Sequence, residues 1–531
     1  MMKKVLFCFS FLFCVSIYSQ DLGGRVDYDL PQFVITGKRT FQFPVLKKLD
    51  SELVNTLGPE FLRPPLPKYN LTFAHLRDPQ RPVADFEPKL EFVSGSFTLT
   101  SGNLFLPKAD LDFTIPLRGA MINFGAKGFL RRDYLPNADE SFFTGFTGFK
   151  FFTDTESEFL PGAEIFGKID YTRSTYRLFE STTPELQQQL STGNTELGLK
   201  SSASDVYQVG LSLKGEITDL AGTVFSEQIL RVNAFANFQI EFIEVQSEVK
   251  FSQVSLDNQN EKGLASSRLS LTGLGGFNIS RFAKVYGGIE YITNDNDAVL
   301  KPQARFSMKF FNGIYIIASY SPSVIIMSNR DLLKQNRYFN ENFLQNYYYK
   351  EDHALNGSIK FESQDLWEVK GGLKFFNSTN YYYFVQDGTT GKFNVAPADV
   401  TSFSSYGSFV IFPGYLGRFY GEAKYNHLRD SDGKQIPFVP SLEVFAGYGT
   451  AITNEIDINA KLTLTSGTYT DIANTNSIDP FFNVEFDATY RLNRNVEIKV
   501  IAENLINQEF PAWGLYRNPG FSIQAGASIK W

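Results

Sequence analysis

The last eleven residues of the chain, FSIQAGASIKW, alternate between two kinds of side chain. Every second residue from Phe521 to Trp531 is apolar, and the residues between them are polar or glycine. A period of two without a slip predicts a β-strand with two different faces. In a soluble sandwich the apolar face would point to a protein core, whereas in a membrane barrel it would point to lipid. One strand does not decide between these folds.

The same alternation recurs from about residue 89 onward, without a convincing helical domain. It is clear in residues 243–251, 456–464 and 482–492, where the polar positions carry full charges of both signs. In a membrane barrel the charged set would line the interior and the apolar set would face lipid. We therefore expect an interior position for Glu485, Asp487, Glu497 and Lys499, and a lipid-facing position for Val484, Phe486, Val496, Ile498 and Val500.

The connections between these segments alternate between short and long. Tight turns are expected at Arg494 and Asn495 and at Thr453 and Asn454, and short connections at residues 412–414 and 311–313. Long loops are expected at residues 507–520, 466–480, 427–437 and 328–352. Long extracellular loops and short periplasmic turns are typical of outer-membrane barrels. The pattern predicts an antiparallel transmembrane barrel of about 22 strands, from the segment near residues 89–100 to residues 521–531.

The composition favours the membrane interpretation. Aromatic residues make up 15% of the chain, with 53 Phe and 26 Tyr, and the mean hydropathy is −0.18. Aromatic girdles flank the apolar band of outer-membrane barrels. After the first 20 residues no apolar run is long enough for a transmembrane helix. The formal net charge of −7 argues against nucleic acid as a partner.

The N-terminal region is interpreted as two segments. Residues 1–20 have a basic start, a short apolar run and small polar residues, which indicate a secretory signal peptide. Both cysteines, Cys8 and Cys14, lie in it, and a lipid-modified Cys14 is the alternative interpretation. Residues 21–88 are rich in proline and predict an extended, mostly irregular periplasmic segment, so the barrel would comprise residues 89–531.

Several short motifs are candidates for a helix or a site. Residues 182–193, TTPELQQQLSTG, predict a short extracellular helix. The triplet at residues 351–353 and the sequence DSDG at residues 430–433 are interpreted as solvated loop or turn residues rather than metal ligands. Packing of the long loop is favoured over ligand binding for the aromatic set Phe339, Phe343, Tyr347, Tyr348 and Tyr349. No residue is assigned a catalytic, cofactor-binding or metal-binding role.

The C-terminal end resembles that of TonB-dependent outer-membrane receptors. The residues that carry the resemblance are Glu503, Asn504, Leu505, Asn507 and Phe510, then Pro519 and Gly520, and the terminal Trp531. Near the other end, LPQFVITGKR at residues 30–39 is similar to the TonB box of that family. Its residues Phe33, Val34, Ile35, Thr36 and Gly37 form a strand-prone stretch that can add to a partner's sheet. The alternative is an N-terminal strand or spacer without a partner.

The chain departs from this family in one respect. Only residues 40–88 separate the TonB-box-like stretch from the barrel, which is too short and proline-rich for the family's globular plug. The resemblance implies transport of a solute, or a barrel component of a transport assembly, with a TonB-type periplasmic protein or a separate plug or lid subunit as partner. The alternative is a structural or surface-binding outer-membrane barrel that conducts nothing. No enzymatic activity and no cofactor are expected.

Overall fold

The structure is a computed structural model. It describes residues 94–531, except 155–159, 161, 202–205, 260–261, 295–296, 311–312, 343–346, 364–365 and 515. The expected signal peptide, the segment 21–88 and the TonB-box-like residues 33–37 therefore lie outside the described residues. So does Phe343 of the aromatic set.

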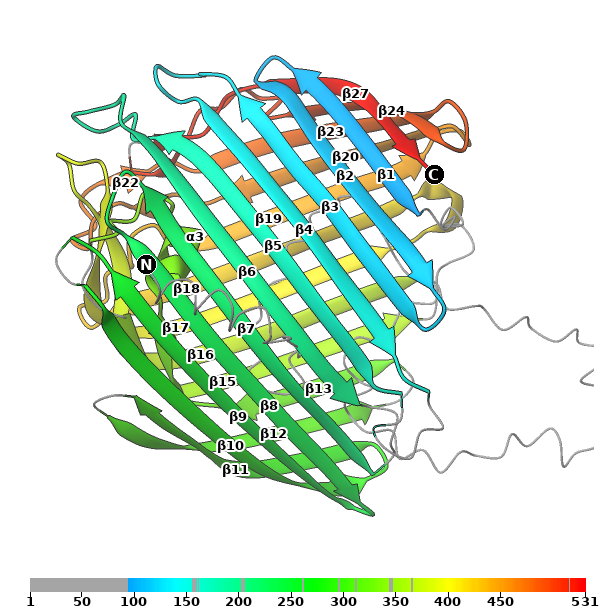
Figure 1. Ribbon diagram of the computed structural model, residues 1–531, viewed down its shortest axis with the longest axis vertical. Coiled ribbons are helices and arrows are strands. Elements are labelled where there is room, and N and C mark those ends of the chain that lie inside the picture. The colour runs from blue at the N-terminus through cyan, green and yellow to red at the C-terminus, as the bar shows by residue number, and fades with distance from the viewer. Residues whose placement is uncertain are drawn as a thin grey trace, which may run out of the picture.

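The described chain forms one closed antiparallel β-barrel (Figure 1). The main sheet contains 23 strand segments. Two of them, β13 (Ile314–Tyr320) and β14 (Ser323–Met327), both pair with β15 (Tyr347–Ser363) and are parts of one interrupted strand. The barrel therefore has 22 strands, which confirms the number expected from the sequence.

The strands run alternately between the end of the barrel with short turns, here called the short-turn end, and the end with long loops, here called the long-loop end. Those that run toward the long-loop end include β13 and β14. The others are β1 (Gly95–Gly102), β3 (Ala120–Arg131), β5 (Glu164–Arg177), β7 (Tyr207–Ala221), β9 (Ile243–Asp257), β11 (Ala283–Asn294), β16 (Trp367–Gln386), β18 (Arg418–Asp430), β20 (Ile456–Thr465) and β24 (Val496–Glu503). The returning strands include β15. The others are β2 (Phe105–Leu117), β4 (Glu140–Phe152), β6 (Gln187–Ser201), β8 (Ser226–Ile240), β10 (Leu264–Ser280), β12 (Ala298–Phe310), β17 (Phe393–Ile411), β19 (Leu442–Ala451), β23 (Phe481–Arg491) and β27 (Ser522–Lys530).

The barrel closes where the first and last strands meet. Strand β1 pairs with β27 from Ser96 opposite Lys530 to Gly102 opposite Gln524. At the rim, the backbone N–H of Gly95 donates to the carbonyl of Trp531 and receives the reciprocal bond, each 3.0 Å long. Closure pairs the first strand with the last, which a strand structure in lipid requires because hydrocarbon offers no hydrogen-bond partners.

Alternation along each strand separates two faces, as the sequence predicts. Large apolar side chains are exposed on the outer face, among them Leu373 (56%), Leu355 (51%) and Ile359 (50%). Opposite residues of an antiparallel pair point to the same side, so the register carries one face continuously around the sheet. An apolar face of this extent around a closed barrel is the transmembrane surface of an outer-membrane protein.

Loop lengths follow the expected segregation in part, with exceptions at both ends of the barrel. Short connections join β19 to β20 and β23 to β24, and the loops after β18, β20 and β24 are long. The long loops contain the small hairpins β21 (Thr468–Tyr469) with β22 (Ser477–Ile478), and β25 (Pro511–Trp513) with β26 (Tyr516–Arg517). At the short-turn end the connection between β4 and β5, residues 153–163, is long. At the long-loop end the connections between β1 and β2, residues 103–104, and between β7 and β8, residues 222–225, are short.

Two local expectations are wrong. Residues 182–193 do not form a helix, because Gln187–Ser201 is strand β6, paired on both sides with β5 and β7. Residues 347–352, expected in a loop, extend strand β15. The described helical elements are α3 (Asn329–Gln335) and a 3-10 turn, η2 (Gly414–Leu416). Neither of these helical elements is long and apolar enough to cross a membrane.

Candidate functional site

The inner wall of the barrel carries charged side chains in opposite-sign pairs. Examples are Lys127 with Asp110 at 3.1 Å and Lys284 with Glu244 at 2.7 Å. The carboxylate of Glu244 also accepts a hydrogen bond from the Tyr286 hydroxyl at 2.9 Å. A wall of paired charges is suited to contact with water and polar solutes: the Lys127–Asp110 pair is exposed, whereas the Lys284–Glu244 pair is buried.

The residues expected on the two faces of β23 and β24 occupy them. The Nζ of Lys461 lies 3.3 Å from Glu485 Oε2, and Asn459 Nδ2 donates to Asp487 at 2.9 Å. Glu497 pairs with Lys499 and Lys530 on the same face. The apolar residues alternate with these and share the other face with the exposed side chains of the outer surface, including Phe482 and Ile529: they are Val484, Phe486, Val496, Ile498 and Val500.

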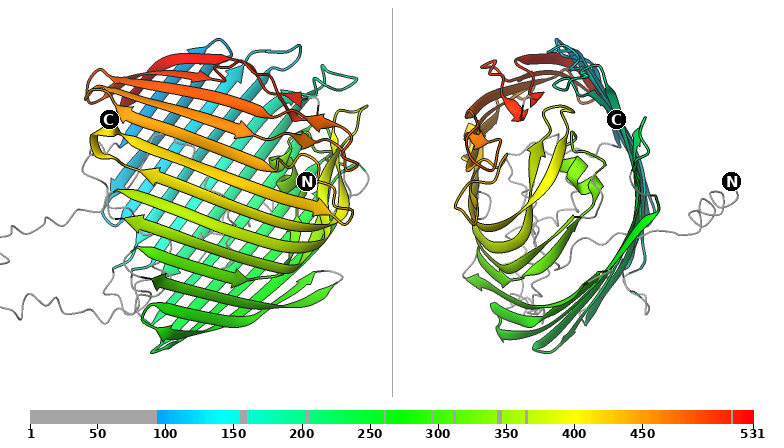
Figure 2. Two further views of the ribbon diagram at one scale, coloured as in Figure 1. Left: turned by 180° about the vertical axis from the view of Figure 1, so that it is seen from behind. Right: turned by 90° about the vertical axis from the view of Figure 1, so that its left-hand side faces the viewer.

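One long loop folds into the barrel instead of projecting outward. Residues 328–342, here called the inward loop, contain α3, and Figure 2 (right) shows α3 inside the outline of the barrel. The helix begins with a capping box: the Ser328 hydroxyl accepts from the Asp331 N–H, and the Asp331 carboxylate accepts from the Ser328 N–H. The helix is short, so packing against the wall rather than its own propensity must stabilise it.

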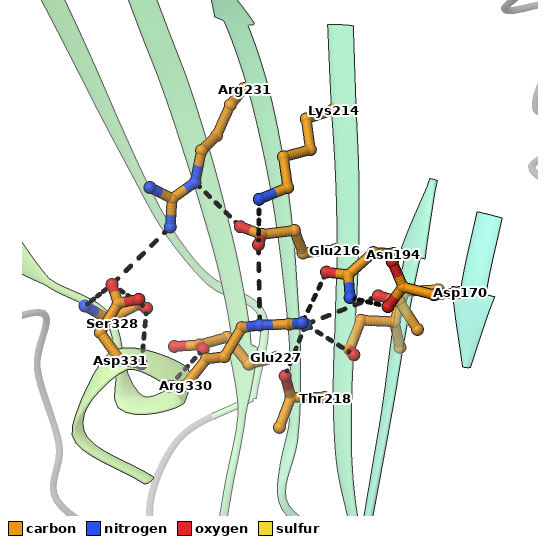
Figure 3. A network of polar contacts seen from close by, with 12 residues as sticks. Asp170, Asn194, Lys214, Glu216, Thr218, Glu227, Arg231, Ser328, Arg330 and Asp331 are labelled. Atoms are coloured by element: carbon orange, nitrogen blue, oxygen red, sulfur yellow. Dashed lines mark hydrogen bonds and ion pairs between the residues drawn. The ribbon is translucent and has the colours of Figure 1, made fainter. Parts of the chain in front are cut away.

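Arg330 joins the inward loop to strands β6 and β7 (Figure 3). Its side chain is 2% exposed. Nη1 donates to the Ile217 carbonyl at 3.1 Å and to the Thr218 hydroxyl at 3.2 Å, and Nη2 donates to Asn194 Oδ1 at 2.5 Å. Nε lies 3.6 Å from the carboxylate of Glu216. A buried guanidinium needs such a set of acceptors, because an unpaired buried charge is strongly destabilising.

Two wall carboxylates complete this contact. Glu216 also pairs with Lys214 at 3.0 Å and with Arg231 at 2.9 Å, so its charge is shared among three cations. Glu227, at the start of β8, is fully buried and accepts hydrogen bonds from the first two N–H groups of α3, those of Asn329 (3.0 Å) and Arg330 (2.8 Å). A carboxyl group at this position accepts from donors that have no partner inside the helix and lies at the positive end of the helix dipole, where a negative charge is favourable.

The second half of the inward loop is held by aromatic contacts and one ion pair. Arg337 Nη1 lies 2.7 Å from Glu140 Oε1, and the guanidinium sits over the rings of Tyr176 and Tyr338, 5.3 Å from each centroid. Tyr338 stacks on Tyr516 of the β25–β26 hairpin with ring centroids 3.6 Å apart. Burial raises the pKa of the Tyr338 and Tyr516 hydroxyls above its usual range.

The inward loop spans the long-loop mouth of the barrel. It leaves the wall between β14 and β15, and its Arg337 reaches Glu140 at the start of β4. Between β4 and β15 lie nine strands in one direction and eleven in the other, counting β13 and β14 as one, so these strands stand on opposite sides of the ring. A buried cluster that includes Phe339, Phe393 and Tyr516 fills the space around the inward loop.

The aromatic set near the inward loop packs, as favoured from the sequence. Phe339, Tyr347 and Tyr349 belong to this buried cluster, while Tyr348 points the other way and is 36% exposed. The Tyr347 hydroxyl donates to the Asn380 carbonyl at 2.8 Å. These side chains therefore form the core of the extracellular closure.

The local motifs at 351–353 and 430–433 have structural partners. Glu351 lies 3.4 Å from Lys374, Asp352 accepts from Thr379, and His353 contacts the Tyr320 hydroxyl at 3.0 Å. The Asp430 carboxylate accepts from the N–H groups of Asp432 and Lys434, which makes the DSDG sequence a turn. Within the described ranges no group of three or more His, Cys, Asp or Glu side chains is placed to hold a metal ion.

The inward loop was not expected from the sequence. Arg330 meets Glu216 and Glu227, which are more than 100 residues away along the chain, so no local pattern links them. The available signal was the sequence SNRD at residues 328–331, a Ser followed three residues later by an acidic residue before Leu332 and Leu333, which is a helix start. It predicts the helix but not its location inside the barrel.

Comparisons with known proteins give the fold. No family model matches the sequence, and no curated protein matches it significantly. Among solved structures, the ferric-catecholate import receptor Fiu from E. coli K12, in its closed form, is 10% identical with a TM-score of 0.62, covering 82% of each chain. The copper transporter OprC is 11% identical with a TM-score of 0.60, covering 83% of this chain and 81% of its own.

A third solved structure agrees with these two. The siderophore receptor PiuA from Acinetobacter baumannii is 10% identical with a TM-score of 0.61, covering 83% of this chain and 82% of its own. These three structures are described as two receptors and a transporter. The chain is an outer-membrane β-barrel that shares the barrel fold of these receptors, as its C-terminal sequence suggested.

Proposed function

We propose that this protein is the barrel of an outer-membrane uptake system, through whose lumen a polar solute passes. The observation that supports the proposal is a closed 22-strand barrel with a charged, ion-paired inner wall and a mouth spanned by its own loop. A barrel of this size encloses far more space than its side chains fill. The solved neighbours are described as import receptors or transporters for siderophores and copper, but the solute of this chain is not assigned.

The proposed partners follow from the N-terminal segment. We propose that residues 33–37 add as a strand to a TonB-type periplasmic protein, and that a separate plug or lid subunit completes the assembly. The same proposal takes residues 1–20 as a signal peptide and residues 21–88 as a periplasmic segment. Affinity purification of the tagged protein from outer membranes, compared with a variant in which residues 33–37 are replaced by Gly and Ser, tests it. Equal recovery of a periplasmic protein with both forms would contradict the proposal that residues 33–37 bind it.

Conductance distinguishes uptake from a structural role. Purified protein in a planar bilayer, with and without residues 21–88, is expected to show ion-conducting openings in at least one form. A barrel that stays silent in both forms, and also after removal of the inward loop, would favour the structural or surface-binding alternative. We propose no catalytic step: the described histidine His353 contacts Tyr320, and His427 is exposed on the outer side of β18.

A further inference from the structure

The two halves of the inward loop are held to the wall in different ways. Residues 328–331 are held by charged and polar contacts to β6, β7 and β8, through Arg330 with Glu216 and through the helix N–H groups with Glu227. Residues 337–339 are held by aromatic packing and the Arg337–Glu140 ion pair. The hydrogen bonds and ion pairs of the first set can be replaced by hydrogen bonds to water. The second set excludes water from a cluster of aromatic rings.

In the first half of the inward loop, two amide side chains at the ends of α3 are buried unfavourably. Asn329, the first residue of α3, and Asn336, its C-cap, are 1% and 0% exposed. Among the described residues, both amide atoms of the Asn329 side chain and the Nδ2 of Asn336 have no hydrogen-bond partner. A buried polar group without a partner is destabilising, and exposure to water would relieve it. Burial of Leu332 and Leu333, at 0% and 3% exposure, opposes that release.

We propose that the inward loop is a gate, and that the contacts of Arg330 with Glu216 and of α3 with Glu227 form its latch. In the closed state the inward loop blocks the long-loop mouth from within. When the latch contacts are lost, α3 leaves β6–β8, the buried amides become hydrated, and the lumen opens on that side. This inference rests on the proposed function, because a gate matters only if the lumen conducts.

A cysteine reporter measures the latch independently of conduction. Thr218, 1% exposed, lies beneath Arg330. In a full-length chain with Cys8 and Cys14 replaced by Ala, Thr218→Cys supplies a single thiol that is covered while the latch is closed. Its rate of reaction with a water-soluble maleimide reports how often α3 leaves the wall.

The latch variant is Arg330→Met, which keeps a similar length but removes the charge and the donors. We expect the labelling rate to rise about tenfold or more, equivalent to losing ~1.4 kcal/mol of latch contacts. Arg491→Met is the matched control, because Arg491 pairs with Asp457 at the other end of the barrel and does not touch the inward loop. Glu227→Gln, a milder change, is expected to give a smaller increase and serves if Arg330→Met does not fold.

Conductance of the same variants separates this inference from the proposed function. Openings that are more frequent in Arg330→Met than in Arg491→Met, together with faster labelling, support the gate. An unchanged labelling rate in correctly folded Arg330→Met and Glu227→Gln overturns the latch, whatever the conductance. Faster labelling with no conductance in any variant supports a movable loop but overturns passage through the lumen. Folding is checked by the shift in gel mobility between unheated and boiled samples.

Discussion

Phe486 and Glu485 are neighbours in β23 but face different solvents. Glu485 pairs with Lys461 on the inner wall, and Phe486 lies on the outer face opposite Ala460 and Ala502. Phe486→Arg is expected to destabilise the barrel by roughly 2–4 kcal/mol, the cost of arginine near the bilayer midplane. The measurement is the urea midpoint of the barrel folded in lipid vesicles.

Glu485→Arg is the control for this prediction. It also introduces arginine, but into a polar environment, where losing one partly exposed ion pair costs about 0–1 kcal/mol. Equal loss of stability in the two variants would contradict the assignment of the two faces, and with it the membrane-facing surface.

Asp387 illustrates how a loop residue responds to pH. Its carboxylate accepts from the N–H and hydroxyl of Thr389 and from Thr390, and these bonds lower its pKa to about 2. Because the folded pKa lies below the unfolded value, the stabilisation is complete above the unfolded pKa and is lost as the pH falls through about 2. We expect Asp387 to remain charged at pH 3. The carboxyl carbon shift of labelled aspartate, compared with Asp387→Asn, checks this.

At the scale of single elements, α3 depends on its cap. Ser328→Ala removes the hydroxyl that accepts from the Asp331 N–H, and loss of such a cap costs about 1 kcal/mol. We expect faster hydrogen exchange of the α3 amides with an unchanged unfolding midpoint for the barrel. Ser321→Ala, outside the helix, is the control. A matching loss of protection in neighbouring β7 would show that α3 and the wall open as one unit.

A strand could be predicted from the sequence where one side of the segment faces lipid and the other side faces the lumen. Strands β20 and β23 follow from alternation alone, since each residue meets either lipid or the lumen. The segment QQQL at residues 187–190 has helix-forming side chains, but hydrogen bonding to β5 and β7 overrides that preference. The position of Arg330 in the barrel depends on contacts between distant segments, which a single sequence does not display.

For the whole molecule, the strand number and the barrel could be predicted, but the fit of the two strands at the closing seam could not. Strand number follows from the repeat of alternating segments and turns, which is local information. Closure depends on whether β1 and β27 approach closely enough to pair, more than 400 residues apart. The size of the side chains at the seam therefore decides whether β1 and β27 can pair, and the alternation of polar and apolar residues does not predict this.

Gly526 is one of two glycines at which the seam leaves no room for a side chain; a Cβ on Gly102 would likewise lie 1.8 Å from the Ile523 carbonyl oxygen. A Cβ on Gly526 would lie 1.9 Å from the carbonyl oxygen of Leu99 and 2.6 Å from the Cα of Thr100, both backbone atoms of β1. No rotamer change relieves such an overlap, so Gly526→Val must push β1 and β27 apart. Overpacking usually costs about 1–3 kcal/mol, and a clash with backbone belongs at or above the upper end of that range.

Gly526→Val is therefore expected to reduce the fraction of chains that assemble into a closed barrel. Ala527→Val is the matched control, because Ala527 is the next residue, pairs with Leu99 and Ile498 on the outer face, and gains apolar surface toward lipid. After refolding into lipid vesicles, the heat-modifiable band should be strongly reduced for Gly526→Val and unchanged for Ala527→Val. Equal assembly of the two variants would mean that the barrel tolerates separation at this seam, and that closure by β1 and β27 does not limit its folding.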